Sequence, residues 1–67
     1  MTSKAELIRK IEELLLLDPD TELKNIRYRP DPETVVMIFT TGEVIEMEIT
    51  GYSFQDLLWE IIDTVYA

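Results

Sequence analysis

Carboxylates are the chemically useful side chains that this sequence offers in quantity. The chain has 14 Asp and Glu residues, but no His and no Cys. The lack of His removes the commonest general base and metal ligand, and the lack of Cys removes thiolate chemistry and disulfides. An acid–base or metal site would therefore have to be built from carboxylates and hydroxyl groups.

Glu46 and Glu48 form the carboxylate pair whose spacing best suits chemistry. Residues two apart on a strand share a face and lie about 7 Å apart, a spacing compatible with glycoside hydrolysis or a hard cation. We expect this pair on an open sheet face without a cleft, and no third acid is placed to assist it. We therefore interpret both glutamates as solvated, and predict neither cofactor, metal nor small-molecule substrate.

Two further patterns imitate functional sites. The alternating acids Asp18, Asp20 and Glu22 resemble a calcium-binding loop but lack its glycine and distal glutamate, so we interpret them as a helix stop around Pro19. Ser3 and Ser53 precede helical patterns, and no base is present to activate either hydroxyl. Both serines are predicted to be N-caps, and the protein is not expected to be an enzyme.

The charge is divided unevenly along the chain. Residues 1–29 carry six acids and six bases, whereas residues 30–67 carry eight acids and no base, giving a net charge of −8. One interpretation is solubility; the other is a basic partner protein, because a field of one sign steers association. Direct binding to nucleic acid is not expected, since phosphates require Lys and Arg.

The elements that position these residues are organised around the apolar, β-branched segment 34–40, which is typical of a central strand. Helical periodicity predicts helices over 3–17 and 53–66, and strands are expected over 22–29 and from about residue 43 to Gly51. We predict one α+β domain, residues 1–67, with α-β-β-β-α order: a three-stranded antiparallel meander with two helices packed on one face.

Two turns fix the predicted register. A four-residue loop over 30–33 places Tyr28 opposite Val35, Ile26 opposite Met37, and Lys24 opposite Phe39. A three-residue loop with Gly42 in the left-handed region places Met37 opposite Ile45 and Val35 opposite Met47. Both turns select the same inward face. Its predicted residues are Ile26, Tyr28, Val35, Met37, Phe39, Ile45 and Met47, and the outward face carries Arg27, Arg29, Val36, Ile38, Val44, Glu46 and Glu48.

Each helix has an apolar stripe that is predicted to face the sheet. The first helix, with a predicted Ser3–Glu6 capping box, contributes Leu7, Ile8, Ile11, Leu14 and Leu15. The second contributes Phe54, Leu57, Leu58, Ile61, Ile62 and Val65. Its apolar arc spans about 200°, more than one sheet face and one neighbouring helix usually cover, so part of it should stay exposed.

Trp59 and Tyr66 lie on the flank of this arc, beside Ile62. As core residues they would cover the edge between helix and sheet; as surface residues they are the types that anchor binding, with Glu60 and Asp63 as a polar rim. Both interpretations remain open, and a second copy of the chain is an alternative partner to a basic protein. The candidate partner-binding residues are Trp59, Ile62, Tyr66, Glu60, Asp63, Glu46 and Glu48.

The element order resembles that of the double-stranded-RNA-binding domain over the whole chain. That family holds phosphates with Lys residues at the start of its second helix, where this sequence has Ser53-Phe54-Gln55-Asp56. In that family the loop beside the second strand usually supplies polar or basic contacts, whereas the loop before the second predicted strand of this chain is Pro30-Asp31-Pro32-Glu33. The resemblance implies the fold, but its missing motif argues against RNA binding.

The capping pattern, the Asp-Pro turns and the composition also resemble a computationally designed miniprotein, in which local choices agree with the fold. In size and charge alone, the chain is similar to small acidic phage proteins that inhibit nucleases. We expect a non-catalytic, designed protein-binding module, an acidic inhibitor that presents carboxylates to a basic nucleic-acid-binding protein such as a nuclease. The alternatives are a designed scaffold without natural function and a phage-type anti-defence protein that mimics nucleic acid.

The sequence also bears on location. No apolar run approaches the ~20 residues needed to span a membrane. The stretch Met1-Thr2-Ser3-Lys4 lacks the pattern of a signal peptide. A cytoplasmic location without membrane contact is expected.

Overall fold

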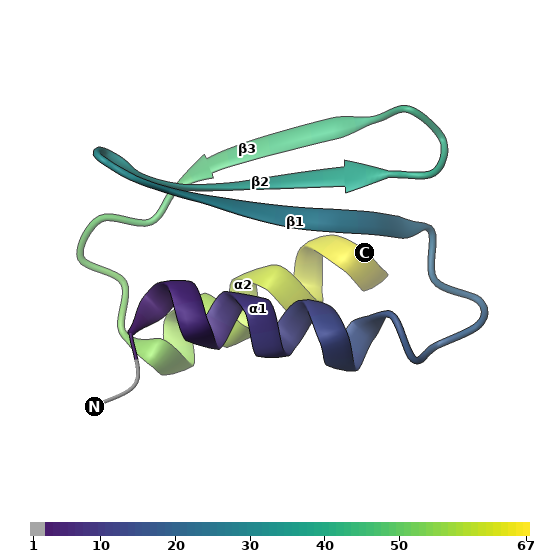
Figure 1. The fold of residues 1–67 in the computed structure, drawn as a ribbon, viewed down its shortest axis with the longest axis horizontal. Coiled ribbons are helices and arrows are strands. Elements are labelled where there is room, and N and C mark those ends of the chain that lie inside the picture. Colours follow the sequence, from purple (N-terminus) through teal and green to yellow (C-terminus); the bar gives the residue numbers. More distant parts are fainter. Residues whose placement is uncertain (1–2) are drawn as a thin grey trace.

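The computed structural model describes residues 3–67, which form two layers (Figure 1). The elements are α1 (Lys4–Leu15), β1 (Leu23–Pro30), β2 (Glu33–Phe39), β3 (Val44–Glu48) and α2 (Phe54–Tyr66). The strands form an antiparallel sheet in the order β1-β2-β3, and both helices lie on one face of it (Figure 1). The predicted α+β fold and α-β-β-β-α order are confirmed. Met1 and Thr2, part of the stretch used to argue against a signal peptide, lie outside the described residues.

Serine side chains begin both helices, as predicted. Ser3 Oγ accepts a hydrogen bond from Glu6 N at 3.1 Å, which forms the serine half of the predicted capping box. At α2 the reciprocal box is complete: Asp56 N donates to Ser53 Oγ at 3.1 Å, and Ser53 N donates to Asp56 Oδ2 at 3.3 Å. The Glu6 half of the predicted box at α1 does not form, so α2 alone has a complete box; both serine caps satisfy backbone donors that the first helical turn leaves unpaired.

The end of α1 differs from the prediction. The helix stops at Leu15, two residues before the predicted Leu17. Leu17 N bonds to Leu14 O at 3.2 Å and Asp18 N to Leu15 O at 3.1 Å, so a tighter turn closes the helix. Asp18 precedes Pro19 and is disfavoured in helical geometry, so the helix cannot continue past this turn.

The first hairpin has the predicted register near its turn but a shorter loop. Tyr28 pairs with Val35, which confirms that part of the register. Pro30 pairs with Glu33, so only Asp31 and Pro32 form the loop, and the peptide bond between them is cis. The predicted four-residue loop and this two-residue loop give the same strand pairing, because two additional residues form the closing pair.

The predicted pairing of Lys24 with Phe39 is wrong. Ile26 pairs with Met37 as expected, but a register shift between Leu23 and Asn25 places Leu23 opposite Phe39. A β-bulge inserts one residue and reverses which side chain faces the core. Leu23 is therefore buried at 2% exposure, while Lys24 is exposed.

The second hairpin confirms the predicted three-residue loop. Phe39 N donates to Glu43 O at 2.9 Å, and Gly42 has φ of +95°, a conformation that a β-branched residue such as Thr41 resists. Met37 pairs with Ile45 and Val35 with Met47. The two hairpins thus direct the same side chains toward the helices.

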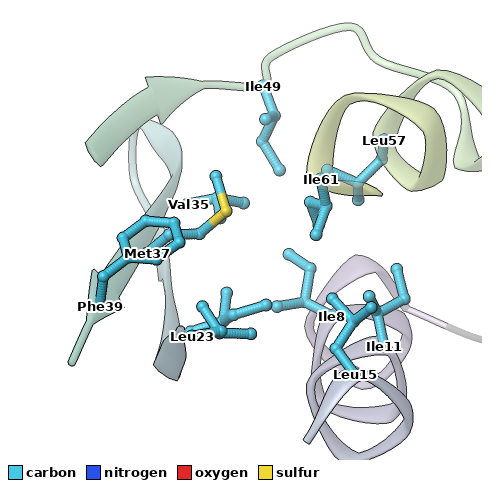
Figure 2. Close-up of a cluster of buried hydrophobic side chains, with 11 residues drawn as sticks. Ile8, Ile11, Leu15, Leu23, Val35, Met37, Phe39, Ile49, Leu57 and Ile61 are labelled. Carbon is cyan, nitrogen blue, oxygen red and sulfur yellow. The ribbon is translucent and has the colours of Figure 1, made fainter. Parts of the chain in front are cut away.

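The core lies between the sheet and the two helices (Figure 2). Leu23 and Ile49 are buried although the predicted inward face omitted both. Three residues of the predicted helix stripes, Leu14, Phe54 and Leu58, are exposed instead, because three strands are too narrow to cover the full apolar arcs. The buried residues are Ile8, Ile11, Leu15, Leu23, Ile26, Val35, Met37, Phe39, Ile49, Leu57 and Ile61.

Candidate protein-binding surface

Trp59 is a surface residue of α2. Leu57 and Ile61 of this helix are fully buried against the sheet. At about 100° per residue, Trp59 lies on nearly the opposite side of the helix from these two. Its exposed fraction is 59%, so the interpretation of Trp59 as a core residue is wrong.

Tyr66 joins the end of α2 to the segment that follows α1. Its hydroxyl donates a hydrogen bond to Asp18 Oδ2 at 2.9 Å, while 53% of the residue remains exposed. The bond to Asp18, and to a smaller extent burial, raises the pKa of Tyr66 above its ordinary value. Tyr66 is therefore bonded to Asp18, yet it still presents aromatic surface to solvent.

Leu58 and Ile62 occupy the side of α2 that faces α1. They lie between the buried face of α2 and Tyr66, which contacts Asp18 just beyond α1. Leu14 is placed symmetrically on α1, since Glu12, about 200° away around that helix, contacts β1 instead. These residues form an apolar outer helix surface that faces away from the sheet. We define it as Leu14, Leu58, Trp59, Ile62 and Tyr66.

Acidic residues border the outer helix surface. Glu60 and Asp63 are exposed on α2, on the side of Trp59 away from α1. Neither takes part in the three ion pairs formed by residues 3–67. Their carboxylates are consequently available to a cationic partner group, and the structure does place them beside Trp59.

Glu46 and Glu48, the other two candidate residues, lie on the far face of the sheet. Glu46 Oε1 is 2.5 Å from Arg29 Nη2, and Thr50 Oγ1 donates to Glu48 Oε1 at 3.3 Å. The predicted site is therefore divided between two faces of the molecule. The predicted register had already placed both glutamates on the outward face, and the observed pairing of Val36 with Glu46 and of Thr34 with Glu48 confirms that placement.

The outer sheet face is not flat, and the expectation that it lacks any cleft is corrected. A hollow of about 430 Å³ is lined by Arg27, Tyr28, Arg29, Val36 and Glu46. Arg29 holds the Glu46 carboxylate there, and Glu48 is not part of the lining. The two glutamates do not converge on this hollow as a catalytic pair would.

A polar cluster missed by the sequence analysis connects α1 to the first hairpin. Glu33 accepts hydrogen bonds from Tyr28 Oη at 2.9 Å and from Lys4 Nζ at 3.2 Å. The bond from Tyr28, followed by the bond from Lys4, holds the pKa of Glu33 below its usual value. The pKa of Tyr28 is raised, first by burial and then by its bond to Glu33. Lys4 Nζ also donates to Ile49 O at 3.4 Å, so the cluster fixes the start of α1 over the sheet.

Within residues 3–67, no group of three or more acidic side chains is arranged to hold a metal ion. In the same range, no helix has the length and apolar character needed to cross a membrane. The chain matches no protein-family model, no curated protein and no solved structure. The fold and the surface thus define it as a small two-layer α+β domain with an exposed aromatic helix face.

Proposed function

We propose that this protein is a non-catalytic binding module that uses the outer helix surface to bind a basic protein. The main observation in support of this proposal is the exposure of Trp59. A tryptophan that is 59% exposed leaves a large apolar area in water, and Trp and Tyr are enriched among residues that dominate binding energy. An exposed patch of this kind, bordered by polar residues, is typical of a protein interface.

The acidic border supports the choice of a basic partner. Glu60 and Asp63 would meet Lys or Arg around the apolar contact, as the polar rim of an interface does. The base-free segment 30–67 adds a long-range negative field that accelerates encounter with such a partner. Nucleic-acid-binding proteins such as nucleases present surfaces of the required sign, and the proposal places the module with them in the cytoplasm.

RNA binding is not proposed, although the element order is that of the double-stranded-RNA-binding domain. The start of α2, where that family holds phosphates, carries the Ser53–Asp56 capping box. An Asp carboxylate at this position repels phosphate instead of binding it.

The experiment measures binding of the immobilised protein to a panel of basic nucleic-acid-binding proteins. Trp59→Ala should abolish binding to a member of the panel, and Asp63→Asn should weaken it most at low salt. Leu16→Ala is the matched control, because Leu16 is an exposed apolar residue on the side of α1 away from α2. A binding affinity that changes neither with salt concentration nor in Trp59→Ala would contradict the proposal.

Self-association is a second candidate function for the outer helix surface. The same exposed aromatic residues would pair across a two-fold axis in a dimer. Sedimentation as a concentration-dependent dimer that Trp59→Ala converts to a monomer would favour this alternative. If the protein stays monomeric at all concentrations, self-association is excluded and the basic protein remains the proposed partner of the outer helix surface.

Two origins are compatible with the proposed activity. The serine caps and Asp-Pro hairpin support a designed protein, whether a binder or a scaffold without natural function. The acids of segment 30–67 support a phage-type nucleic-acid mimic. Competition by duplex DNA for the basic partner would favour the mimic; a scaffold would bind no panel member.

A further inference from the structure

The free edge of β3 carries a row of backbone groups without strand partners. Ile49 N donates to Glu33 O at 2.9 Å and Glu43 O accepts from Phe39 N at 2.9 Å, so the odd-numbered residues of this segment direct their backbone groups toward β2. Backbone direction alternates along a strand. The N–H and C=O groups of Val44, Glu46 and Glu48 therefore face away from the sheet.

The opposite edge of the sheet differs, because a side chain covers it. The N–H of Ile26 on β1 donates to Glu12 Oε2 of α1 at 2.6 Å. The β3 edge has no such bond from residues 3–67 in the region of Val44 to Glu48. An exposed edge of this kind is a template for a further strand.

Side chains on the two faces of β3 specify what such a strand would contain. On the outer face Val44, Glu46 and Glu48 are exposed, so residues opposite the glutamates would be Lys or Arg. On the inner face Ile45 and Met47 are only partly buried, whereas their neighbours Val35 and Met37 on β2 are fully buried. Apolar residues of an added strand would complete the cover over Ile45 and Met47.

We propose that the β3 edge binds an extended peptide segment in which basic and apolar residues alternate, as a fourth, antiparallel strand. A second copy of this chain fits less well, since pairing two β3 edges in antiparallel fashion would bring like charges at Glu46 and Glu48 together. Asp56 lies on the side of α2 away from α1, which is the side of β3, and it adds to the negative field there. The proposal is independent of the outer helix surface.

A labelled short peptide of alternating lysine and valine with blocked ends is the probe, and binding is followed by fluorescence anisotropy. Glu48→Gln should weaken binding by roughly two- to fivefold, the range for one exposed ion pair. Glu22→Gln is the matched control, because it removes the same charge at an exposed position ahead of β1. Equal losses in the two variants would overturn the proposal in favour of general attraction by charge.

Backbone pairing is tested with N-methylated peptides. Lysines opposite Glu46 and Glu48 direct their N–H groups at β3, so methylation at the lysines should weaken binding roughly tenfold or more through lost hydrogen bonds. Methylation at the valines, whose N–H groups point away, should leave binding unchanged. Equal binding of both methylated peptides would overturn strand addition.

Amide hydrogen exchange provides an independent reading. Peptide binding should slow exchange at Val44, Glu46 and Glu48, while Trp59→Ala should leave peptide affinity unchanged. Protection that appears only on α2, or loss of peptide binding in Trp59→Ala, would overturn the proposal. Failure of the outer helix surface to bind a basic protein would leave this result unaffected.

Discussion

Glu12 Oε2 accepts a hydrogen bond from Ile26 N at 2.6 Å, which joins the middle of α1 to β1 beside the β-bulge. The Ile26 side chain is buried, and its backbone N–H faces away from β2. Without Glu12, this donor at the edge of the core would lack a protein partner. A helical side chain thus replaces the missing strand at this edge of the sheet.

Glu12→Ala should destabilise the fold by about 1–3 kcal/mol, the range for a buried donor left without its hydrogen-bond partner. Glu13→Ala is the control, because Glu13 forms only an exposed i,i+4 pair with Arg9 at 3.9 Å, worth about 0.5 kcal/mol or less. Urea unfolding of both variants measures the difference. Equal losses would show that the Glu12–Ile26 bond contributes nothing specific.

Met37→Ala should be far more damaging than Val36→Ala. Met37 is fully buried between β2 and the helices, where truncation costs about 2–5 kcal/mol. Val36 is only partly buried and lies on the outer sheet face, so its loss costs much less. Urea unfolding in which Val36→Ala lost more stability than Met37→Ala would contradict the burial of Met37.

Trp59→Ala should leave the fold almost unchanged, within about 0.5 kcal/mol, because surface substitutions away from special features have small effects. Ile61→Ala, two residues along the same helix, should cost about 2–5 kcal/mol because Ile61 is fully buried. Thermal and urea unfolding of the two variants make the comparison. A large loss in Trp59→Ala would mean that its ring packs into the core.

Glu33 should make stability depend on pH in the acid range. The bonds from Tyr28 and Lys4 lower its pKa in the folded protein below the ordinary value of 4.5. Its stabilising contribution is therefore complete above pH 4.5 and is lost as the pH falls through the folded-state pKa.

The comparison for Glu33 is with Glu33→Gln, followed by urea unfolding across the acid range. The variant should be less stable than the parent at neutral pH, and the difference should shrink as the pH falls below 4.5. A difference that stays constant throughout would rule out titration of Glu33 as its source.

Double-stranded RNA should not bind this protein. The double-stranded-RNA-binding domain, which this element order resembles, holds phosphates with lysines at the start of its second helix. The corresponding residues here are Ser53-Phe54-Gln55-Asp56, and the acids of segment 30–67 repel phosphate. A gel shift at low salt, where charge attraction is strongest, is the most demanding check. A retained band under these conditions would contradict the prediction.

The sequence by itself determined the order of elements, both serine caps and most of the strand register. Caps and turns depend on residues a few positions apart, such as Ser53 and Asp56, or on one residue such as Gly42 with its positive φ. The alternation of apolar residues along β2 then admits only one inward face, because a shift of one residue would turn the whole set outward. These signals are local and could be predicted.

Only the tertiary structure decided the bulge beside Lys24 and the bond between Glu12 and Ile26. Alternation placed Lys24 opposite the inward-facing Phe39. The bulge puts Leu23 there instead, which avoids desolvating an ammonium group. Glu12 and Ile26 are 14 residues apart in sequence, so the periodicity of neither element predicts their hydrogen bond. The exposure of Trp59, which the sequence left open, depends on how α2 packs against the sheet, and that follows from the fit of the whole core.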